Sequence, residues 1–441
     1  MMTARHTVLE GDLLSMLPSL PDSHFDAVLC DPPYHLTQNY RGGSGKKCNH
    51  QPGDGGTTLY GRQRVGTDTS SSKGFMGHAW DGGDIAFHPE TWEAVMRVMK
   101  PGAYLMAFGG SRTFHRLAVA LEDAGFVLVD TLMYLYGTGF PKSHNVAVDI
   151  DKIQGGSGKR SGPARRNTYD GAQRNPVKHG NPADQPHTGE WGLHSTPHGL
   201  PTIALETREA HRFAGYGTAL KPAYEPILLC RKPGEKTYAA NALKWGCGAL
   251  NIEGCRIDGE PPHHNYGRTS GKSTVPFNTP DSGRWPANVM LDDEAAKALD
   301  DQSNAKSKGG ASRFFYVSKV STKERQAGVF HDVKTRFTHG TTLRDMENAE
   351  KQGNHHPTLK PISLAQHLAT LLLPPARDEE PRKMLVPFSG AGSEMIGSLL
   401  AGWDHVTGIE QSAEYAEIAR QRIAWWVTNP QKKPVIRRKA S

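Results

Sequence analysis

A carboxylate, two prolines and an aromatic ring stand together after an apolar run near the start of the sequence. The run covers residues 25–30, and Asp31-Pro32-Pro33-Tyr34 follows it directly. The Asp31 carboxylate and the main-chain carbonyl of Pro32 can each accept one hydrogen of an amino group, and such fixed acceptors stabilise charge that develops during a reaction. Consecutive prolines fix φ and donate no N–H, so no donor competes there. The tetrapeptide therefore has the residue types needed to activate an amino group.

A second strand-to-loop junction lies near the end of the sequence. An apolar run over 384–387 is followed by a loop that contains Phe388, Ser389, Gly390, Ala391 and Gly392. Glycine tolerates positive φ and allows close approach of the backbone to a ligand. A helical stretch and an apolar strand over 405–409 come next, and then Glu410. An acid about 20 residues after the first glycine is typical of the ribose-binding carboxylate of nucleotide sites. A solvated strand-end carboxylate is the alternative interpretation of Glu410.

Together, the two junctions resemble those of the beta class of DNA adenine-N6 methyltransferases of bacteria and phages. The first resembles the catalytic tetrapeptide of these enzymes and the second their S-adenosylmethionine (SAM) loop, FxGxG; catalysis before cofactor is the order of the circularly permuted class. The segment at 356–361, HPTLKP, resembles the motif that precedes the SAM loop. Further matching segments lie at 10–34, 100–110, 137–146, 221–233, 283–291 and 312–325. The resemblance therefore covers nearly the whole chain.

The resemblance assigns a role to each residue of these motifs. It implies that Asp31, Pro32, Pro33 and Tyr34 are catalytic, with Tyr34 stacking on an adenine that is flipped out of the duplex. The implied SAM-binding residues are Asp12, Asp31, Thr358, Lys360, Phe388, Ser389, Gly390, Gly392 and Glu410. Asp12 would contact the adenine part of SAM and Glu410 its ribose. The segment with Thr358 and Lys360 would cover its methionine end.

The cofactor loop departs from the family pattern, which is usually DPF followed by GSGTT. This chain has Val386 in place of the aspartate and Ser393-Glu394 in place of the two threonines. The first change removes a polar group near the amino acid part of SAM. Glu394 suits the dipole of a helix N-terminus but would repel a carboxylate ligand. We expect a site that binds SAM less tightly.

The implied fold is α/β: a Rossmann-like doubly wound sheet of the SAM-dependent methyltransferase type, circularly permuted and with an inserted target-recognition domain. Strands near 6 and 26 must join strands near 384 and 405 in one sheet. The expected parts are the catalytic half 1–145 with a basic loop 41–80, a mobile basic insert 146–205, a core strand 206–233, the target-recognition domain 234–351, the SAM-binding half 352–428 and a basic tail 429–441.

Helical patterns flank these strands. Residues 91–100 form a predicted helix that ends at Pro101-Gly102, and 117–123 form another that Gly125 closes. Ser412 is the predicted N-cap of a last helix. The apolar face of that helix would bury Tyr415, Ile418, Ala419, Ile423 and Trp426.

The charge of the chain favours a nucleic acid as partner. The 441 residues carry a net charge of +7, and basic residues concentrate in 41–75, 151–187 and 431–441. We expect double-stranded DNA as the substrate, and a homodimer, because protein symmetry tends to mirror a palindromic site. The predicted DNA-binding residues are Arg41, Lys46, Lys47, Arg313 and Lys319. Solvated linkers are the alternative interpretation of the basic segments.

Other classes of site are not indicated. The five cysteines form no CxxC pair, and the adjacent His263 and His264 have no spaced partners, so we expect no metal. No run approaches the ~20 apolar residues of a membrane span, and the first residues lack a signal-peptide pattern. We expect a cytoplasmic protein in a bacterial or phage-infected cell.

Three alternative functions stay open. A cytosine-N4 methyltransferase uses the same geometry, although Asp31 in place of serine favours adenine by resemblance. An RNA or protein-amide methyltransferase usually has its cofactor loop upstream of the catalytic one. A DNA-binding regulator with a degenerate cofactor loop would explain the altered residues 386–394.

Overall fold

The computed structural model describes residues 5–34, 84–137, 139, 143–156, 160–161, 202–203, 205–259, 283–303, 310–318, 327–328, 338–339, 342–343, 359–378 and 380–429. The chain divides into two compact units. The first comprises Met1–Thr138 and Ala223–Ser441, and the second Gly139–Pro222.

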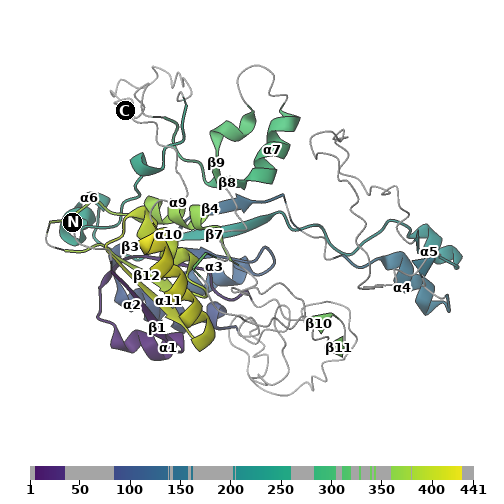
Figure 1. Cartoon of the computed structure of the whole chain (residues 1–441), viewed down its shortest axis with the longest axis horizontal. Helices are drawn as coiled ribbons and strands as arrows, with labels where there is room; N and C mark the ends of the chain where they lie inside the picture. The colour runs from purple at the N-terminus through teal and green to yellow at the C-terminus, as the bar shows by residue number, and fades with distance from the viewer. Residues whose placement is uncertain are drawn as a thin grey trace, which may run out of the picture. The chain divides into compact units, whose positions relative to one another are not determined.

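A nine-stranded sheet forms the centre of the first unit (Figure 1). In spatial order its strands are β1 (Arg5–Glu10), β13 (His405–Glu410), β12 (Lys383–Pro387), β2 (Phe25–Cys30), β3 (Met99–Phe108), β7 (Tyr224–Arg231), β4 (Val127–Leu135), β8 (Val289–Asp292) and β9 (Tyr316–Ser318). Only β7 runs antiparallel to its neighbours among these described strands. The expected assembly of the sheet from both ends of the chain is confirmed, because β13 and β12 lie between β1 and β2.

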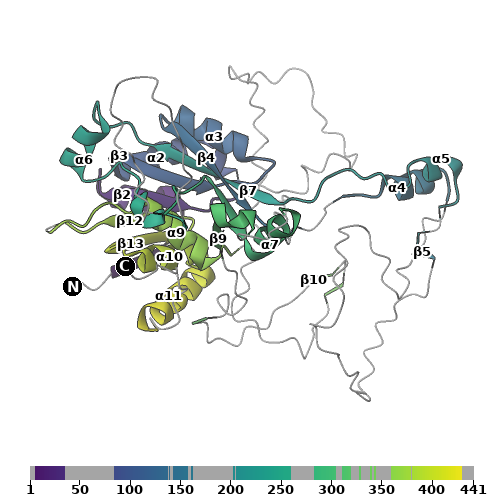
Figure 2. The same ribbon diagram turned by 90° about the horizontal axis from the view of Figure 1, so that it is seen from above.

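Helices cover both faces of this sheet, as Figure 2 shows for α2 and α3 on one side and α9, α10 and α11 on the other. The first face carries α1 (Leu13–Met16), α2 (Pro89–Val98) and α3 (Phe114–Asp123). The second face carries α9 (Ile362–Leu372), α10 (Ser393–Ala401) and α11 (Ala413–Thr428). Two further helices of the unit are α6 (Tyr238–Trp245) and α7 (Asp293–Gln302). The predicted α/β class is confirmed, whereas the permutation and the target-recognition insert stay predictions.

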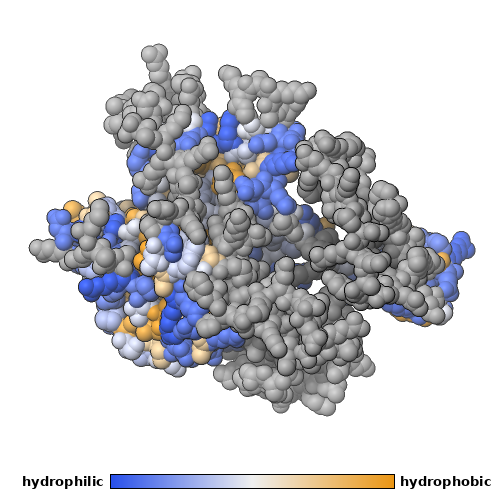
Figure 3. Space-filling view, viewed as in Figure 1, coloured by the Kyte–Doolittle hydropathy of each residue, from blue (hydrophilic) through white to orange (hydrophobic). Residues whose placement is uncertain are grey.

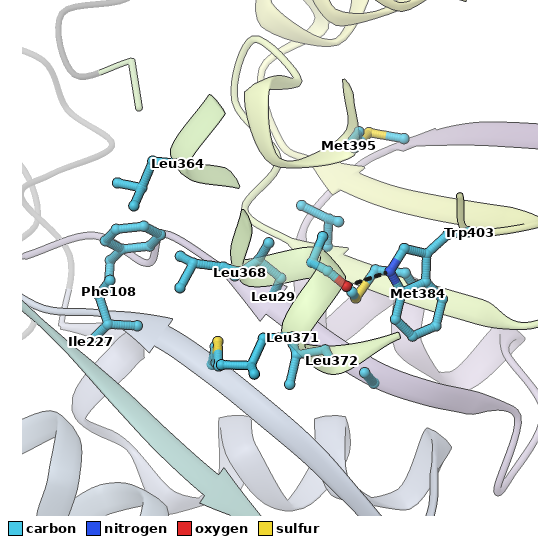
Figure 4. Packing of buried hydrophobic residues seen from close by; sticks show 14 of the residues in the cluster. Leu29, Phe108, Ile227, Leu364, Leu368, Leu371, Leu372, Met384, Met395 and Trp403 are labelled. Atoms are coloured by element: carbon cyan, nitrogen blue, oxygen red, sulfur yellow. Dashed lines mark hydrogen bonds between the residues drawn. The ribbon is translucent and has the colours of Figure 1, made fainter. Parts of the chain in front are cut away.

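Successive side chains of the central strands belong alternately to two apolar layers, one on each face of the sheet. In β3, Tyr104, Met106 and Phe108 belong to the layer under α9 and α10, whereas Leu105 and Ala107 belong to the opposite layer. Successive strand residues point to opposite faces, so a strand that is buried on both faces must be apolar throughout. Figure 4 shows the α9 layer, in which leucines of the helix pack over the sheet.

A buried tryptophan closes one end of the α9 layer. Trp403 is fully buried, and its indole N–H donates to the carbonyl of Ala369, at a distance of 2.9 Å (Figure 4). A buried indole N–H needs such a partner, because an unpaired donor in an apolar layer is costly. The loop after α10 is thereby attached to α9.

Two predicted helices have different bounds in the structure. Helix α2 ends at Val98, and Met99 already pairs with Phe25 as the first residue of β3, so the expected helix over 91–100 is too long. Helix α3 begins earlier than expected, at Phe114, and the chain turns at Gly125 with φ +97°. The last predicted helix is confirmed as α11. Its cap Ser412 accepts from the Tyr415 N–H, and the five side chains expected to be buried are buried.

The second unit contains two short helices, α4 (Val146–Ile153) and α5 (Arg208–Arg212), and two-residue strands β5 (Arg160–Ser161) and β6 (Thr202–Ile203). The buried Asp151 of α4 accepts hydrogen bonds from the backbone N–H groups of Glu206 and Thr207, at 2.8 and 2.9 Å. Residues 162–201 of the predicted basic insert lie outside the described residues. The remaining strands of the first unit, β10 (Thr338–His339) and β11 (Thr342–Leu343), form a short antiparallel pair.

Among the coloured residues of Figure 3, hydrophilic ones predominate, and apolar ones appear in smaller areas between them. None of the helices that the structure describes is long and apolar enough to cross a membrane.

The buried carboxylate of Asp26 connects β2 to both neighbouring strands, β3 and β12, and to the loop before β12. The side chain of Asp26 is fully buried and lies 2.9 Å from Lys100 Nζ and 2.8 Å from Arg377 Nη2. It also accepts from the backbone N–H of Lys383 at 2.8 Å. Glu380 pairs with the same two cations but is half exposed.

We expect Asp26→Ala to lower the free energy of unfolding by about 3–5 kcal/mol, because the buried Lys100 ammonium loses its fully buried carboxylate partner and keeps only the half-exposed Glu380. The matched change Glu380→Ala removes a half-exposed partner of the same cations and should cost less than about 1 kcal/mol. Urea unfolding of both variants measures the difference. Equal losses would show that Asp26 contributes no more than a surface ion pair.

Candidate active site at the carboxyl edge of the sheet

The two junctions singled out in the sequence lie side by side in the fold. Strands β2 and β12 are parallel neighbours, with Met384 opposite Ala27 and Leu385 opposite Val28. Their carboxyl ends therefore lie at the same edge of the sheet, so residues 31–34 and the loop 388–392 leave the sheet next to each other. In open α/β sheets, ligands bind beyond the carboxyl ends of the strands.

Asp31 is held by two donors. The hydroxyl of Tyr34 donates to Oδ1 at 2.7 Å, and Lys360 Nζ lies 3.2 Å from Oδ2. The same ammonium donates to the Tyr34 hydroxyl at 2.9 Å, and the hydroxyl of Thr113 donates to the Tyr34 carbonyl at 3.0 Å. The catalytic tetrapeptide is therefore fixed by side chains from two other segments. Lys360, predicted as a SAM contact, belongs to this cluster in the structure.

A second carboxylate, Glu225, completes the cluster and was missed by the sequence analysis. Lys360 Nζ donates to Glu225 Oε2 at 2.8 Å. Because β7 runs antiparallel to its neighbours, its first residues lie at the edge where β3 and β4 end. An acid at the start of an otherwise apolar strand is the one signal in the sequence that could have indicated it. We define the Lys360 cluster as Asp31, Tyr34, Glu225 and Lys360.

Burial and charge shift the pKa values of this cluster. Burial raises the pKa of Asp31; the nearby Lys360 opposes this, and the negative charge of Glu225 adds to it. Burial alone would lower the pKa of Lys360, but Asp31 and Glu225 outweigh it and raise that pKa above its usual range. Burial and Asp31 also raise the pKa of Tyr34. The lysine is therefore an ammonium and the tyrosine a neutral hydrogen-bond donor.

Aromatic faces surround the same ammonium. Lys360 Nζ lies 5.1 Å from the ring centroid of Tyr34 and 4.8 Å from that of Phe108. Only 6% of its side chain is exposed. Cation–π attraction increases when the cation is desolvated, so these rings help to hold the lysine in place.

The loop after β12 adopts a left-handed backbone at three positions. Phe388, Gly390 and Gly392 have φ of +57°, +50° and +80°. Such a φ is strained for phenylalanine, and strain of this kind concentrates at functional sites. Phe388 packs edge-on against Trp92, with ring centroids 6.5 Å apart. The hydroxyl of Ser389 is buried and has no hydrogen-bond partner among the described residues.

Glu410 connects this loop to the next helix. Its carboxylate accepts from the N–H of Gly390 at 2.7 Å and from that of Ser412 at 2.9 Å. Burial raises its pKa, and these N–H groups act against that shift. The expected position of Asp12 beside Glu410 agrees with the structure: Gly11 N–H donates to the Glu410 carbonyl, and Asp12 follows as the N-cap of α1.

Helix α11 packs against the loop 388–392 and donates a hydrogen bond to it. A Cβ at Gly392 would lie 3.1 Å from Cβ of Ala419, so this position is packed against the helix. The buried guanidinium of Arg422 donates to the carbonyl of Ala391 and to the Ser393 hydroxyl. The positive φ expected at Gly392 is thus present, and the packing against Ala419 is a second requirement that the sequence did not indicate. Arg422 was not predicted, because helix periodicity gave no reason to expect a buried arginine.

The remaining predicted site residues fall elsewhere. Thr358, Arg41, Lys46, Lys47 and Lys319 lie outside the described residues. Arg313 lies in the short helix η8 (Ala311–Phe314), where its guanidinium donates to the Gly310 carbonyl at 2.9 Å and lies 4.4 Å from the Phe314 ring centroid. Within the part of the chain that the structure describes, no group of three His, Cys, Asp or Glu could hold a metal ion.

Removal of the shared ammonium should destabilise the fold in a pH-dependent way. We expect Lys360→Met to lower the free energy of unfolding by about 3–5 kcal/mol at pH 8, because two carboxylates lose their buried partner. The loss should shrink at pH 5. The pKa of Asp31 is already raised, so without the lysine this group takes up a proton more readily as pH falls, and its neutral form needs no cation.

Urea unfolding at both pH values measures this effect. Lys383→Met is the matched control, since Lys383 makes no side-chain ion pair among the described residues. An equal loss at pH 8 and pH 5 would mean that Lys360 stabilises the fold by the packing of its methylene groups and not by charge.

Comparison with known proteins gives one family and several structures. The sequence profile of the DNA methylase family, N6_N4_Mtase, matches residues 25–421. M1.HpyAVI is similar at 11% identity, over 95% of this chain and 98% of that one, with a TM-score of 0.36. The SAM complex of TTHA0409, a putative DNA modification methylase from Thermus thermophilus, has 14% identity, coverage of 96% and 94%, and a TM-score of 0.35. The cytosine-N4-specific PvuII DNA methyltransferase is similar at 10% identity, over 97% of this chain and 93% of that one, with a TM-score of 0.42.

Proposed function

The chain belongs to the DNA methylase family of N6 and N4 methyltransferases, and we propose that it methylates the N6 amino group of adenine at specific sites in duplex DNA. SAM is the methyl donor. The observation that carries this proposal is the position of Asp31, held by Lys360 and Tyr34, at the sheet edge where the loop 388–392 also begins. This arrangement pairs a fixed acceptor with a backbone able to approach a ligand closely.

The chemistry of the catalytic tetrapeptide follows from its acceptors. The amino group of adenine is a poor nucleophile, because its lone pair is delocalised into the ring. The Asp31 carboxylate and the Pro32 carbonyl accept the two amino hydrogens and localise that lone pair. Lys360 opposes the effect of burial on Asp31 and so favours the ionised carboxylate that this role needs. The Tyr34 ring stacks on the flipped base.

The loop 388–392 has the properties that a SAM site requires. SAM, when bound, supplies an electrophilic methyl group on a sulfonium centre. The left-handed residues let the backbone approach the ligand, and the buried Ser389 hydroxyl has no partner within the described residues. Glu410 already accepts two backbone N–H groups and keeps lone pairs for the ribose hydroxyls. We therefore propose Glu410 as the ribose acceptor.

Duplex DNA as substrate, base flipping and a homodimer are part of the proposal, as is location in the cytoplasm of a bacterial or phage-infected cell. Arg313 and the basic segments are proposed DNA contacts. Preference for adenine over cytosine rests on Asp31 in the first position of the tetrapeptide, by resemblance to adenine-N6 enzymes. A cytosine-N4 product and a regulator without methyl transfer are the rival outcomes, and the next two tests separate them.

We expect Asp31→Ala to lower the single-turnover methylation rate by at least ~100-fold at saturating SAM, because one fixed acceptor of the amino group is lost. SAM affinity should change little. Digestion of the methylated DNA to nucleosides, followed by mass spectrometry, should give N6-methyldeoxyadenosine from the wild type. N4-methyldeoxycytidine would instead support the cytosine alternative, and a variant that keeps more than about a tenth of the rate would exclude the role of Asp31.

We expect Glu410→Ala to weaken SAM binding by about 10- to 100-fold, the range for loss of a hydrogen bond to a charged group. Titration calorimetry measures the dissociation constant. Glu417→Ala is the matched control, because Glu417 is an exposed acid on the neighbouring helix α11. A Glu410 variant that binds like the wild type would rule out the ribose contact. Wild-type protein that gives no heat at millimolar SAM would favour the regulator.

A further inference from the structure

Glu394 is a buried acid in the first turn of α10, two residues after Gly392. Only 5% of the residue is exposed. It stands where the family pattern GSGTT ends in threonine, so it is one of the departures of this chain from its family. Helix α10 follows β12, the strand beside β2, and the charges of Asp31 and Lys360 both act on the pKa of Glu394.

The cations near Glu394 are engaged elsewhere. Lys360 Nζ contacts Asp31, Tyr34 and Glu225, and the guanidinium of Arg422 donates to the Ala391 carbonyl and the Ser393 hydroxyl. Among the described residues, the carboxylate of Glu394 makes no hydrogen bond or ion pair with another side chain. The N-terminal end of the α10 dipole gives it partial compensation.

Charge in this part of the site does not balance. Three carboxylates, those of Asp31, Glu225 and Glu394, face two cations, Lys360 and Arg422. Burial, and then repulsion by Asp31, raises the pKa of Glu394 to about 7, whereas Lys360 and Arg422 act against the shift. The other titratable groups that face it are Tyr34 and Cys30, whose own pKa values are raised by burial and by nearby acids. Both are neutral near pH 7.

We propose that Glu394 is the counter-ion of the methionyl end of SAM. The sulfonium and ammonium groups there outweigh the single carboxylate, so attraction to Glu394 exceeds the repulsion that the sequence alone led us to expect. The Glu394 carboxylate accepts its own backbone N–H but contacts no cation among the described residues. A buried carboxylate without a cation in contact is costly in the free protein, and a cationic ligand beside it removes that cost. The loop lacks an aspartate at Val386, so Glu394 supplies an acid to the same loop from the first turn of α10. This inference rests on the proposed use of SAM.

The proposal predicts that SAM binding releases a proton. In the free protein Glu394 is about half protonated near pH 7, and a cationic ligand lowers its pKa. Affinity for SAM should therefore rise as pH increases through the free-protein pKa and level off above it. Between pH 6.0 and pH 7.5 the expected gain is roughly 5-fold or more, from the proton linkage of a single group.

Calorimetric titration of the full chain with SAM at pH 6.0, 6.75 and 7.5 tests this gain. Glu394→Gln should bind SAM about 10-fold more weakly than the wild type at pH 7.5, and its affinity should not vary with pH. Asp31→Asn is the control for the other buried acid. It removes the charge that raises the pKa of Glu394, so its pH dependence should persist and shift to lower pH.

S-adenosylhomocysteine separates the two cationic groups, because it lacks the sulfonium but keeps the ammonium. Equal weakening of both ligands by Glu394→Gln assigns the ammonium, and weakening of SAM alone assigns the sulfonium. If Glu394→Gln binds both ligands like the wild type, or if Asp31→Asn abolishes the pH dependence, the counter-ion role is overturned while SAM binding stands. Absence of SAM binding by the wild type at every pH would overturn the proposed function together with this role.

Thermal unfolding without ligand distinguishes the counter-ion role from a structural one. Glu394→Gln should unfold at the same or a higher temperature than the wild type at pH 7.5, because the neutral amide removes the repulsion by Asp31. A lower unfolding temperature together with unchanged ligand affinity would show that Glu394 serves only the packing of α10.

Discussion

The ammonium of Lys360 is the interaction on which the rest of the site depends. It joins Asp31 and Tyr34 at the end of β2 to Glu225 at the start of β7, and its own residue lies just before α9. Three segments that are distant in the sequence therefore meet at one buried charge. Because a buried cation is tolerated only with partners in place, formation of the cluster requires that β2, β7 and α9 have already assembled correctly.

The fold accommodates this polar cluster by surrounding it with apolar layers. Helix α9 is buried along almost its whole length, and helices cover the sheet on both faces. The Lys360 cluster and the strained Phe388 lie at the carboxyl edge, whereas the buried ion pairs of Asp26 lie at the opposite end of the strands. The apolar layers thus offset the cost of a preorganised site, as expected where function requires locally unfavourable groups.

The sequence predicted those parts of the site that depend on local signals. Asp31 and the loop 388–392 each follow an apolar strand, and their residue types indicate their chemistry without knowledge of the fold. Glu225 and Arg422 could not be predicted in this way. Their roles depend on partners far along the chain, and a single acid or arginine has no spacing that marks it. Lys360 was recognised as a site residue, but only the fold shows that it contacts Asp31.

The position of β12 and β13 between β1 and β2 has a consequence for how the chain folds. During synthesis, β1 and β2 emerge first, yet each must wait for strands made more than 350 residues later before its pairing is complete. Pairings between such distant segments close large loops and slow folding. Until then β2 has an exposed, apolar edge on the side that β12 will occupy, which is a point of risk for aggregation. Activity thus arises only once synthesis has passed β13, so a chain that stops before this point cannot act on its substrate.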